Sequence, residues 1–485
     1  MSGLPTGLLT RHRRLHFIGI GGAGMSGIAE LCQRLGFEVS GCDMHDSATT
    51  RRLATLGIAL EHGHHPSHIG ARAGGDLDAV IISSAVKFSN PEVVRARALK
   101  IPVIARAEML GELLRMARQG IAVAGTHGKT TTTSLVGLIL EEAGFDPTVA
   151  IGGNLRARGT NVRLGRGDFM VAEADESDAS FLLLLPTIAI VTNIDPEHLD
   201  HYGSMDRVRE AYLSFINRVP FYGRAVLGID SVNVRGLLAS VRKPIITYGE
   251  AADADLRAER IVIDGLSTHF VVMRGNVALG TVTIPSPGRH LALNSLAAIA
   301  VTLEMGIPFE VAARALRTFS GISRRFELKG EAAGRLVLDD YAHHPAEVRA
   351  TLAAARAAFA RRLVTVFQPH RYTRLRDLFD DFLTAFDDTD VLYLADVYAA
   401  GEEPIPDVTS RRLYEALRAR GHLDVHYLGD ETEPAGTLAR ESKRGDVFVT
   451  LGAGDVYLIG ERLLALLGEE PAVTAKAAVS EVKAV

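Results

Sequence analysis

Residues 124–133 read Ala124-Gly125-Thr126-His127-Gly128-Lys129-Thr130-Thr131-Thr132-Thr133 and decide the fold around them. They follow an apolar, β-branched segment typical of a buried strand and lead into residues 131–143, where leucine and isoleucine recur at helical spacing. A glycine loop at a strand-to-helix junction directs backbone N–H groups and a helix N-terminus at phosphate groups. The stretch therefore predicts an ATP site in which Lys129 neutralises the phosphates and Thr130 ligates Mg²⁺.

This loop is shorter than the usual phosphate loop, because only Thr126 and His127 separate its two glycines. The alternative interpretation is a glycine-rich turn before an ordinary helix. The lysine followed by a run of threonines favours the phosphate-binding interpretation.

Composition and charge limit the class of protein. The chain has 485 residues, 47% hydrophobic and 23% charged, which predicts a soluble protein of about three domains. The net charge of -5 includes no basic field for a nucleic acid or an anionic membrane, so neither is expected as a partner. The two cysteines, Cys32 and Cys42, have no metal-binding spacing, which indicates a reducing compartment and argues against a structural zinc.

The N-terminal region superficially resembles a signal peptide, because arginines at positions 11, 13 and 14 precede an apolar run over residues 15–29. Five glycines interrupt that run, so it does not form the apolar helix of a signal peptide. No other apolar stretch has the 18 residues that a membrane span needs. We therefore expect a cytoplasmic protein without a transmembrane helix.

Alternating strand and helix patterns predict an α/β fold of three blocks. The first block, residues 1–118, is predicted to be Rossmann-like. The second, residues 119–320, begins with the phosphate loop and includes a β-rich section over residues 261–284. The third, residues 321–468, repeats the alternation of a doubly wound sheet, and residues 469–485 are predicted to be a mobile tail.

A second glycine loop, residues 19–24, follows the first predicted strand, and Asp43 lies about 20 residues further on. Taken alone, this pattern predicts a dinucleotide site and an NAD-dependent oxidoreductase. A UDP-sugar is an equally suitable ligand, because the loop supplies only a close backbone approach to a pyrophosphate. A glycine turn without a ligand is the third interpretation.

Carboxylates and an imidazole follow two strands of the second block. Glu173 ends one strand and His198 follows the next, so both are predicted to reach the sheet edge where ligands bind in α/β proteins. Two cations suit the transfer of a phosphoryl group to an anionic acceptor, and we expect Glu173 and His198 to ligate them. The neighbouring Asp175, Glu176 and Asp178 are interpreted as a solvated acidic loop.

Eight motifs in sequence order together resemble the Mur ligases of bacterial cell-wall synthesis, from Gly19 to about Leu451. Any one motif is weak evidence, whereas the ordered set is specific. The motifs are residues 19–25, 125–131, 173–178, 193–198, 288–290 with Asn294, 324–326, 339–345 and 367–374.

The resemblance implies an ATP-dependent ligase that joins L-alanine to the lactyl carboxylate of UDP-N-acetylmuramate, with the UDP-sugar on the first domain, ATP on the second and the amino acid on the third. ATP would contact Gly125, Thr126, His127, Gly128, Lys129, Thr130, Thr131, His290, Asn294, Arg325 and Asp340. The UDP-sugar would contact Gly21, Gly22, Ala23, Gly24, Asp43, Ser83 and Ser84, and the amino acid would contact Tyr341, His343, His344, Arg371 and Arg374.

Two positions depart from the family pattern. Leu291 stands where the family often has an asparagine that contacts adenine. Related ligases for later steps hold the second Mg²⁺ with a carbamylated lysine, but this chain has no lysine between Lys129 and Lys243. The resemblance therefore leaves His198 as the leading candidate for that role.

The implied reaction proceeds through an acyl phosphate, because a carboxylate must be activated before an amine attacks it. Either His343 or His344 would take the proton of the incoming ammonium group. A ligase that adds a preformed peptide to the same UDP-sugar is the close alternative, and a module that only binds is disfavoured by the metal-ligating residues. The protein is expected to be a monomer or a homodimer.

Overall fold

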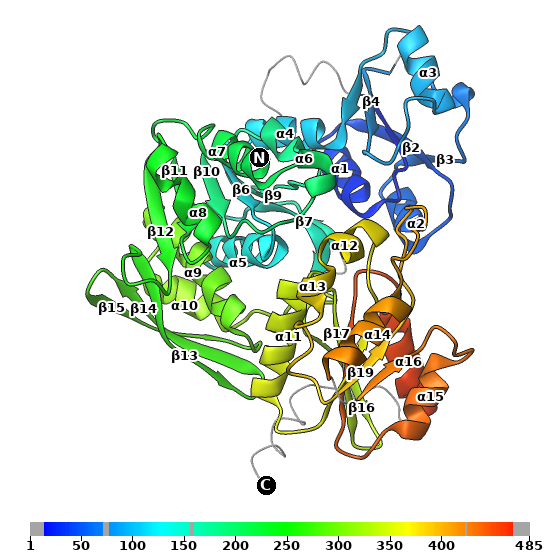
Figure 1. Cartoon of the computed structure of the whole chain (residues 1–485). Helices are drawn as coiled ribbons and strands as arrows, with labels where there is room; N and C mark the ends of the chain where they lie inside the picture. Colours follow the sequence, from blue (N-terminus) through cyan, green and yellow to red (C-terminus); the bar gives the residue numbers. More distant parts are fainter. Residues whose placement is uncertain (1–13, 71–76, 156–159, 422–423, 469–485) are drawn as a thin grey trace. The chain divides into compact units, whose positions relative to one another are not determined.

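The structure is a computed structural model, and it describes residues 14–70, 77–155, 160–421 and 424–468. Three β-sheets with flanking helices make up the fold, which confirms the predicted α/β class (Figure 1). The chain forms two compact units: one has the residues up to 257 with 273–279 and 293–316, and the other has 258–272, 280–292 and the residues from 317 on. The predicted domain boundaries stay predictions, and the predicted tail, residues 469–485, lies outside the described residues.

The first sheet is entirely parallel, with strand order β3-β2-β1-β4-β5, as the Rossmann-like prediction requires. Its middle strands are buried on both faces: Phe17 of β1 belongs to one core cluster and the adjacent Ile18 to another. The sequence did not predict β3, because that edge strand is mostly exposed and has no apolar run. The elements are β1 Arg14–Ile18, α1 Ala23–Arg34, β2 Glu38–Asp43, α2 Ala48–Thr55, β3 Ala59–His62, η2 Pro66–His68, β4 Ala79–Ile82, α3 Pro91–Ala98, β5 Val103–Ala105 and α4 Arg106–Met116.

The second sheet has ten strands in the order β15-β14-β13-β12-β11-β10-β6-β9-β7-β8. Strand β6 lies between β10 and β9, and all three are parallel, so the loop after β6 is flanked by the carboxyl ends of its neighbours. This arrangement positions the candidate site. The elements are β6 Gln119–Ala124, α5 Lys129–Glu142, β7 Thr148–Leu155, β8 Thr160–Arg163, β9 Phe169–Glu173, η3 Ser180–Leu183, β10 Ile188–Val191, α6 Leu199–Tyr202, α7 Met205–Ile216, β11 Arg224–Gly228, α8 Val232–Leu237, η4 Leu238–Ser240, β12 Ile245–Gly249, β13 Leu256–Asp264, β14 Ser267–Arg274, β15 Val277–Ile284, α9 Arg289–Glu304 and α10 Phe309–Leu316.

The third sheet has the order β16-β17-β21-β18-β19-β20 and confirms the doubly wound prediction. Successive residues of β17 face opposite cores, Leu336 and Leu338 on one side and Val337 on the other. Only β16 runs antiparallel to its neighbour. The elements are β16 Glu327–Ala332, β17 Arg335–Asp340, α11 Pro345–Ala358, β18 Leu363–Phe367, α12 Tyr372–Asp377, α13 Phe379–Phe382, β19 Val391–Leu394, α14 Ser410–Arg420, β20 Val425–Tyr427, α15 Pro434–Glu441, β21 Val447–Leu451 and α16 Tyr457–Leu466.

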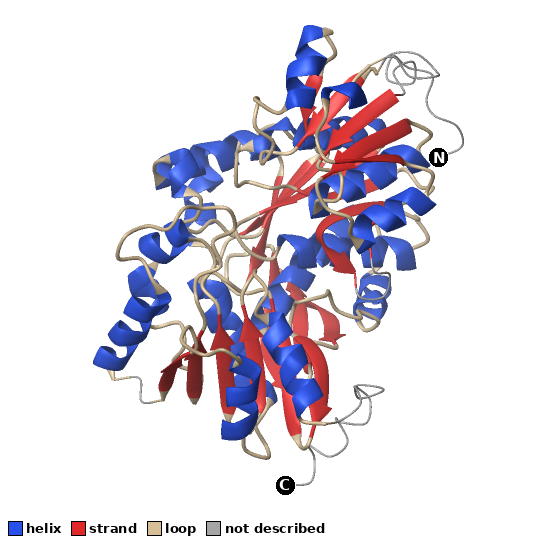
Figure 2. Ribbon diagram, turned by 90° about the vertical axis from the view of Figure 1, so that its right-hand side faces the viewer, coloured by secondary structure: helices blue, strands red, loops and turns tan. Residues whose placement is uncertain are grey.

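The helices cover the sheets. Figure 2 shows blue helices along the red strands, which accounts for strands that are apolar on both faces. Among the described residues, no helix combines the length and the apolar character needed to cross a membrane.

Candidate active site

The phosphate loop joins β6 to α5 and depends on two glycines with positive φ. Gly125 has φ 138° and Gly128 has φ 82°, conformations that favour glycine. A Cβ atom at Gly125 would overlap the side chain of Thr192, and one at Gly128 would lie 2.5 Å from Asn294 Oδ1. Both glycines are therefore required by space as well as by backbone conformation. Asn294, a predicted ATP contact, lies directly beside the loop.

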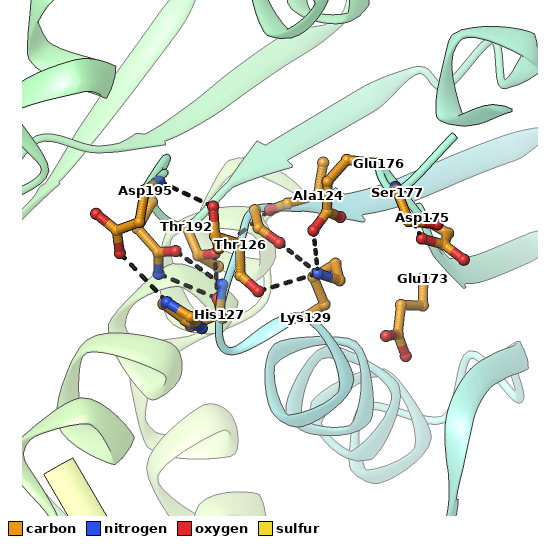
Figure 3. Close-up of polar contacts among 12 residues, drawn as sticks. Ala124, Thr126, His127, Lys129, Glu173, Asp175, Glu176, Ser177, Thr192 and Asp195 are labelled. Carbon is orange, nitrogen blue, oxygen red and sulfur yellow. Dashed lines mark hydrogen bonds and ion pairs between the residues drawn. The ribbon is translucent and has the colours of Figure 1, made fainter. Parts of the chain in front are cut away.

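The loop is held by the segment that follows β10 (Figure 3). The backbone N–H of Thr126 donates to Asn193 O over 3.1 Å, and that of His127 donates to Asn193 Oδ1 over 2.8 Å. The amide of Asn193 donates back to His127 O, and Asp195 N donates to Thr126 Oγ1 over 2.9 Å. His127 Nε2 also lies 3.3 Å from an Asp195 carboxylate oxygen. These bonds fix the shape of the loop.

Lys129 points back over the loop and forms a largely buried ion pair (Figure 3). Its Nζ donates to Gly125 O over 2.6 Å, to Thr126 O over 3.1 Å and to Glu176 Oε1 over 2.8 Å. Burial opposes its charge, but the adjacent carboxylates, Glu176 first, raise the pKa of Lys129. Lys129 therefore stays charged, as a phosphate-binding lysine requires.

Glu176 corrects the sequence interpretation. The acidic run 175–178 was expected to be a solvated loop, but Glu176 is only 5% exposed. Burial raises the pKa of its carboxyl group, while the ammonium of Lys129 opposes that change. A buried carboxylate beside the lysine makes Glu176 part of the site.

Thr130 and Glu173 provide oxygen ligands of the kind that Mg²⁺ prefers. The Thr130 hydroxyl donates to Glu173 Oε2 over 2.9 Å, and the same oxygen accepts the N–H of Gly152 over 2.7 Å. The two predicted ligands are thus adjacent, and their hard oxygen donors fit the ion. His198, the other predicted metal ligand, lies after β10 and precedes α6 with a φ of 55°.

A cavity of about 170 Å³ adjoins this cluster. Lys129 and Glu173 line it from the central sheet, and Gly24 and Arg106 line it from the first. Arg106 donates to an Asp175 carboxylate oxygen over 3.2 Å, and a Cβ at Gly24 would lie 2.5 Å from its guanidinium group. The cavity therefore has two cationic side chains, Lys129 and Arg106, and two carboxylates, Glu173 and Asp175, so an anion could bind the cations and a metal ion the carboxylates.

The first glycine loop is held by its own carboxylate. Asp43 Oδ2 accepts the N–H of Gly21 over 2.8 Å, and a Cβ at Gly21 would lie at that same short distance from the oxygen. Gly22 caps helix α1, which begins at Ala23. Asp43 thus binds the loop itself. The predicted Ser83 and Ser84 lie in the loop after β4.

In the third sheet, Asp340 and the residues after it form a separate cluster. The Asp340 carboxylate is buried and accepts the N–H groups of Phe326 and Ala342, each over 2.8 Å. Burial raises the pKa of Asp340 to about 6, with Arg325 opposing. The Arg325 guanidinium group also lies over the ring of Tyr341.

The two candidate bases have different environments. His343 Nδ1 donates to Tyr341 O over 2.9 Å, which leaves the lone pair on Nε2 of the neutral ring. His344 is the N-cap of α11, where its Nδ1 accepts the N–H of Ala346 and its side chain is buried. His344 has a capping role, so His343 is the better placed to accept a proton.

The predicted pair of arginines already has partners in the chain. Arg371 Nε donates to Glu402 Oε1 over 2.6 Å, and Glu402 also accepts two bonds from Thr373. Arg374 donates to His370 Nδ1 over 3.1 Å and to its carbonyl oxygen. The sequence did not identify Glu402, which lies about 30 residues away with no motif around it.

The predicted adenine contacts lie at the start of α9. His290 is in its first turn, and burial lowers the pKa of the His290 imidazole to about 4, aided by the charge of Arg325. Leu291, at the family's asparagine position, is buried. An apolar side chain there cannot hydrogen-bond a base.

Three family models match successive parts of the chain: the Mur ligase family catalytic domain over residues 14–118, the Mur ligase middle domain over 123–302, and the Mur ligase glutamate ligase domain over 324–454. A curated relative, the UDP-N-acetylmuramate--L-alanine ligase of Anaeromyxobacter dehalogenans (strain 2CP-C), is 54% identical over 462 residues, 94% of this chain and 98% of the relative. The protein of the same name from Geobacter sp. (strain M21) is 53% identical over 452 residues, 93% and 97% of the two chains.

Two solved structures have similar folds. The UDP-N-acetylmuramate-alanine ligase of Thermotoga maritima has 28% sequence identity and a TM-score of 0.77, covering 94% of this chain and 99% of that one. A murein peptide ligase from Psychrobacter arcticus 273-4 has 26% identity and a TM-score of 0.66, covering 95% and 100%.

Proposed function

The chain belongs to the Mur ligase family, and on this premise we propose that it joins L-alanine to the lactyl carboxylate of UDP-N-acetylmuramate with cleavage of ATP to ADP and phosphate. The observation that carries the proposal is the phosphate loop with its charged Lys129 beside Thr130 and Glu173. Relatives named for this reaction are 54% and 53% identical to this chain, over 94% and 93% of its length. The family assignment replaces the dehydrogenase alternative for the first glycine loop.

The first step forms an acyl phosphate. A lactyl carboxylate oxygen attacks the γ-phosphorus of ATP, and the bond to the β,γ-bridging oxygen breaks to release ADP. Lys129 would exchange Glu176 for the phosphate oxygens and stabilise the charge that develops on them. Thr130 and Glu173 would hold Mg²⁺, which when bound offsets phosphate charge.

The second step forms the amide. The amino group of L-alanine attacks the acyl carbon, and inorganic phosphate leaves. His343 would accept the ammonium proton at Nε2, because its Nδ1 is engaged with Tyr341 O. A His343→Gln variant is expected to lose amide formation, whereas ATP–ADP exchange driven by UDP-N-acetylmuramate persists. Unchanged ligation in this variant would remove the assignment.

A phosphate-release panel tests the function. Release is expected to require ATP, UDP-N-acetylmuramate and L-alanine together, and serine and glycine are compared in the same panel. Release that depends on a tripeptide and not on L-alanine would instead identify the peptide ligase, the activity named for the Psychrobacter structure. If neither L-alanine nor the tripeptide causes phosphate release, the ligase proposal is overturned. The two Mg²⁺ ions, the oligomeric state and the cytoplasmic location stay predictions.

A further inference from the structure

A buried cluster in the first sheet takes no part in the proposed reaction. His16 of β1, Cys42 of β2 and Glu92 in the first turn of α3 have no exposed surface. His16 Nε2, Cys42 Sγ and a Glu92 carboxylate oxygen lie within 4.8 Å of one another. Three segments thus bring a nitrogen, a sulfur and an oxygen donor to one point.

His64 adds a fourth donor. Its Nδ1 lies 3.3 Å from Cys42 Sγ and 3.8 Å from Glu92 Oε2, and those two atoms are 2.9 Å apart. The His64 side chain is 25% exposed, so it provides a route from solvent. The other Glu92 oxygen accepts a bond from His68 Nδ1 over 2.5 Å, which fixes the carboxylate from outside the cluster.

The hydrogen bonds orient His16 as a ligand. Ser40 Oγ donates to Leu15 O, so the 2.9 Å contact between His16 Nδ1 and Ser40 Oγ has the imidazole as donor. His16 Nε2 faces Glu92 Oε2 over 3.8 Å, and a bond from His16 to this carboxylate belongs to the hydrogen-bonded network around it. A cation held between the two residues would replace that bond.

The spacing and chemistry of these donors fit zinc. Tetrahedral Zn²⁺ with thiolate, imidazole and carboxylate ligands holds the donor atoms about 3.3–3.6 Å apart. The observed separations lie on both sides of that range, so small movements suffice. Soft thiolate and imidazole ligands also favour Zn²⁺ over Mg²⁺.

We propose that His16, Cys42, His64 and Glu92 form a Zn²⁺ site that fastens α3 and the segment before it to the first sheet. The site is independent of the ligase reaction. Sequence spacing argued against a structural zinc because the ligands come from four separated segments, which only the fold brings together. The alternative is a network of hydrogen bonds centred on the Glu92 carboxylate.

Cobalt(II) substitution of the full-length, chelator-treated chain tests the site. We expect one equivalent of Co²⁺ to bind with thiolate-to-cobalt charge-transfer absorption, and Zn²⁺ to displace it. The absorption should be lost in Cys42→Ala and His64→Ala. It should persist in Cys32→Ala, which removes the other buried cysteine, and in His65→Ala, a neighbour that bonds Ser67. No nucleotide or Mg²⁺ is present, so the result does not depend on the ligase assignment.

A second measurement uses only the wild-type chain and so does not depend on how the variants fold. Zn²⁺ is expected to slow the alkylation of Cys42 and to leave the alkylation of Cys32 unchanged. Peptide mass spectrometry measures both. Absence of thiolate-linked absorption together with equal labelling of Cys42 with and without Zn²⁺ would leave the hydrogen-bonded network as the explanation and overturn the proposal.

Discussion

The phosphate loop and the arginine segment 370–374 use the same kind of ion pair in different settings. Lys129 is paired with Glu176, and Arg371 is paired with Glu402. Around Lys129, adjacent glycines, threonines and a helix start fix the backbone, although its partner Glu176 lies 47 positions away along the chain. Arg371 has no such local motif, and its partner Glu402 lies 31 positions away. A local motif therefore fixes a backbone shape, whereas side-chain partners depend on the fold.

The largest effect is expected from Lys129→Ala, which tests the role of the ion-paired lysine in the phosphate loop. Loss of the ammonium group removes charge stabilisation of the transferred phosphoryl group, and we expect ADP formation to slow by about 10³-fold. The rate of phosphate release at saturating substrate concentrations measures this decrease. Lys443→Ala, which changes an exposed lysine, serves as the control and should match the wild type. A Lys129→Ala rate within tenfold of wild type would show that the loop is not the ATP site.

Glu173→Gln tests the metal ligands of the same loop. The amide keeps the shape but loses the charge beside Thr130, so the Mg²⁺ concentration for half-maximal rate should rise about 10- to 100-fold. A Mg²⁺ titration of ligation gives this value. Glu415→Gln, an exposed carboxylate on α14, should leave the titration unchanged. If Glu173→Gln has the wild-type Mg²⁺ requirement, other groups hold the ion.

His370 provides a pH-dependent test on the arginine side. Burial, then the charges of His343, Arg374 and Arg371, lower the pKa of His370 to about 3. Its unfolded value is near 6.5, so the unfolded chain binds more protons between these values and stability falls as pH falls through this window. At pH 5 the loss is about 2 kcal/mol.

His370→Asn should reduce that pH dependence. Thermal unfolding near pH 7.5 and near pH 5 compares the variant with the wild type, and His45→Asn, which changes an exposed histidine, is the control. An unchanged difference between the two pH values would place the acid sensitivity elsewhere.

The smallest effect is expected from Glu402→Gln. Arg371 would lose its charged partner and its fixed direction, so the KM for L-alanine should rise about tenfold while the KM for ATP stays constant. Steady-state kinetics with each substrate varied separately gives both values. Glu403→Gln, at the exposed neighbouring position, is the matched control. Equal changes in both KM values would contradict a specific role for the pair on the amino-acid side.

Sequence patterns predicted several strands that are continuous apolar runs buried on both faces, such as β18 and β21. The edge strands β3 and β16 have no such run and were missed, and β7, β11 and β12 inside the second sheet were missed as well. The glycine turn between a strand and a helix at residues 125–131 was predicted because its backbone geometry depends on adjacent residues.

Longer-range features were not predictable from one sequence. Glu176 resembles a solvated acidic residue until the fold places Lys129 against it, 47 positions away along the chain. The candidate zinc ligands have no spacing signal, because strands β1 and β2, the loop before η2 and helix α3 each supply one. In both cases the information lies in which segments pack together, and no local pattern specifies it.

The pairing of Lys129 with Glu176 also bears on which anions the proposed ATP site would accept. An incoming anion would have to displace the buried Glu176 carboxylate from Lys129, so a ligand with a single negative charge would gain little. A polyphosphate tail would carry enough charge to displace the carboxylate and to attract a cation as well. We therefore expect free inorganic phosphate to be a poor competitor for this site.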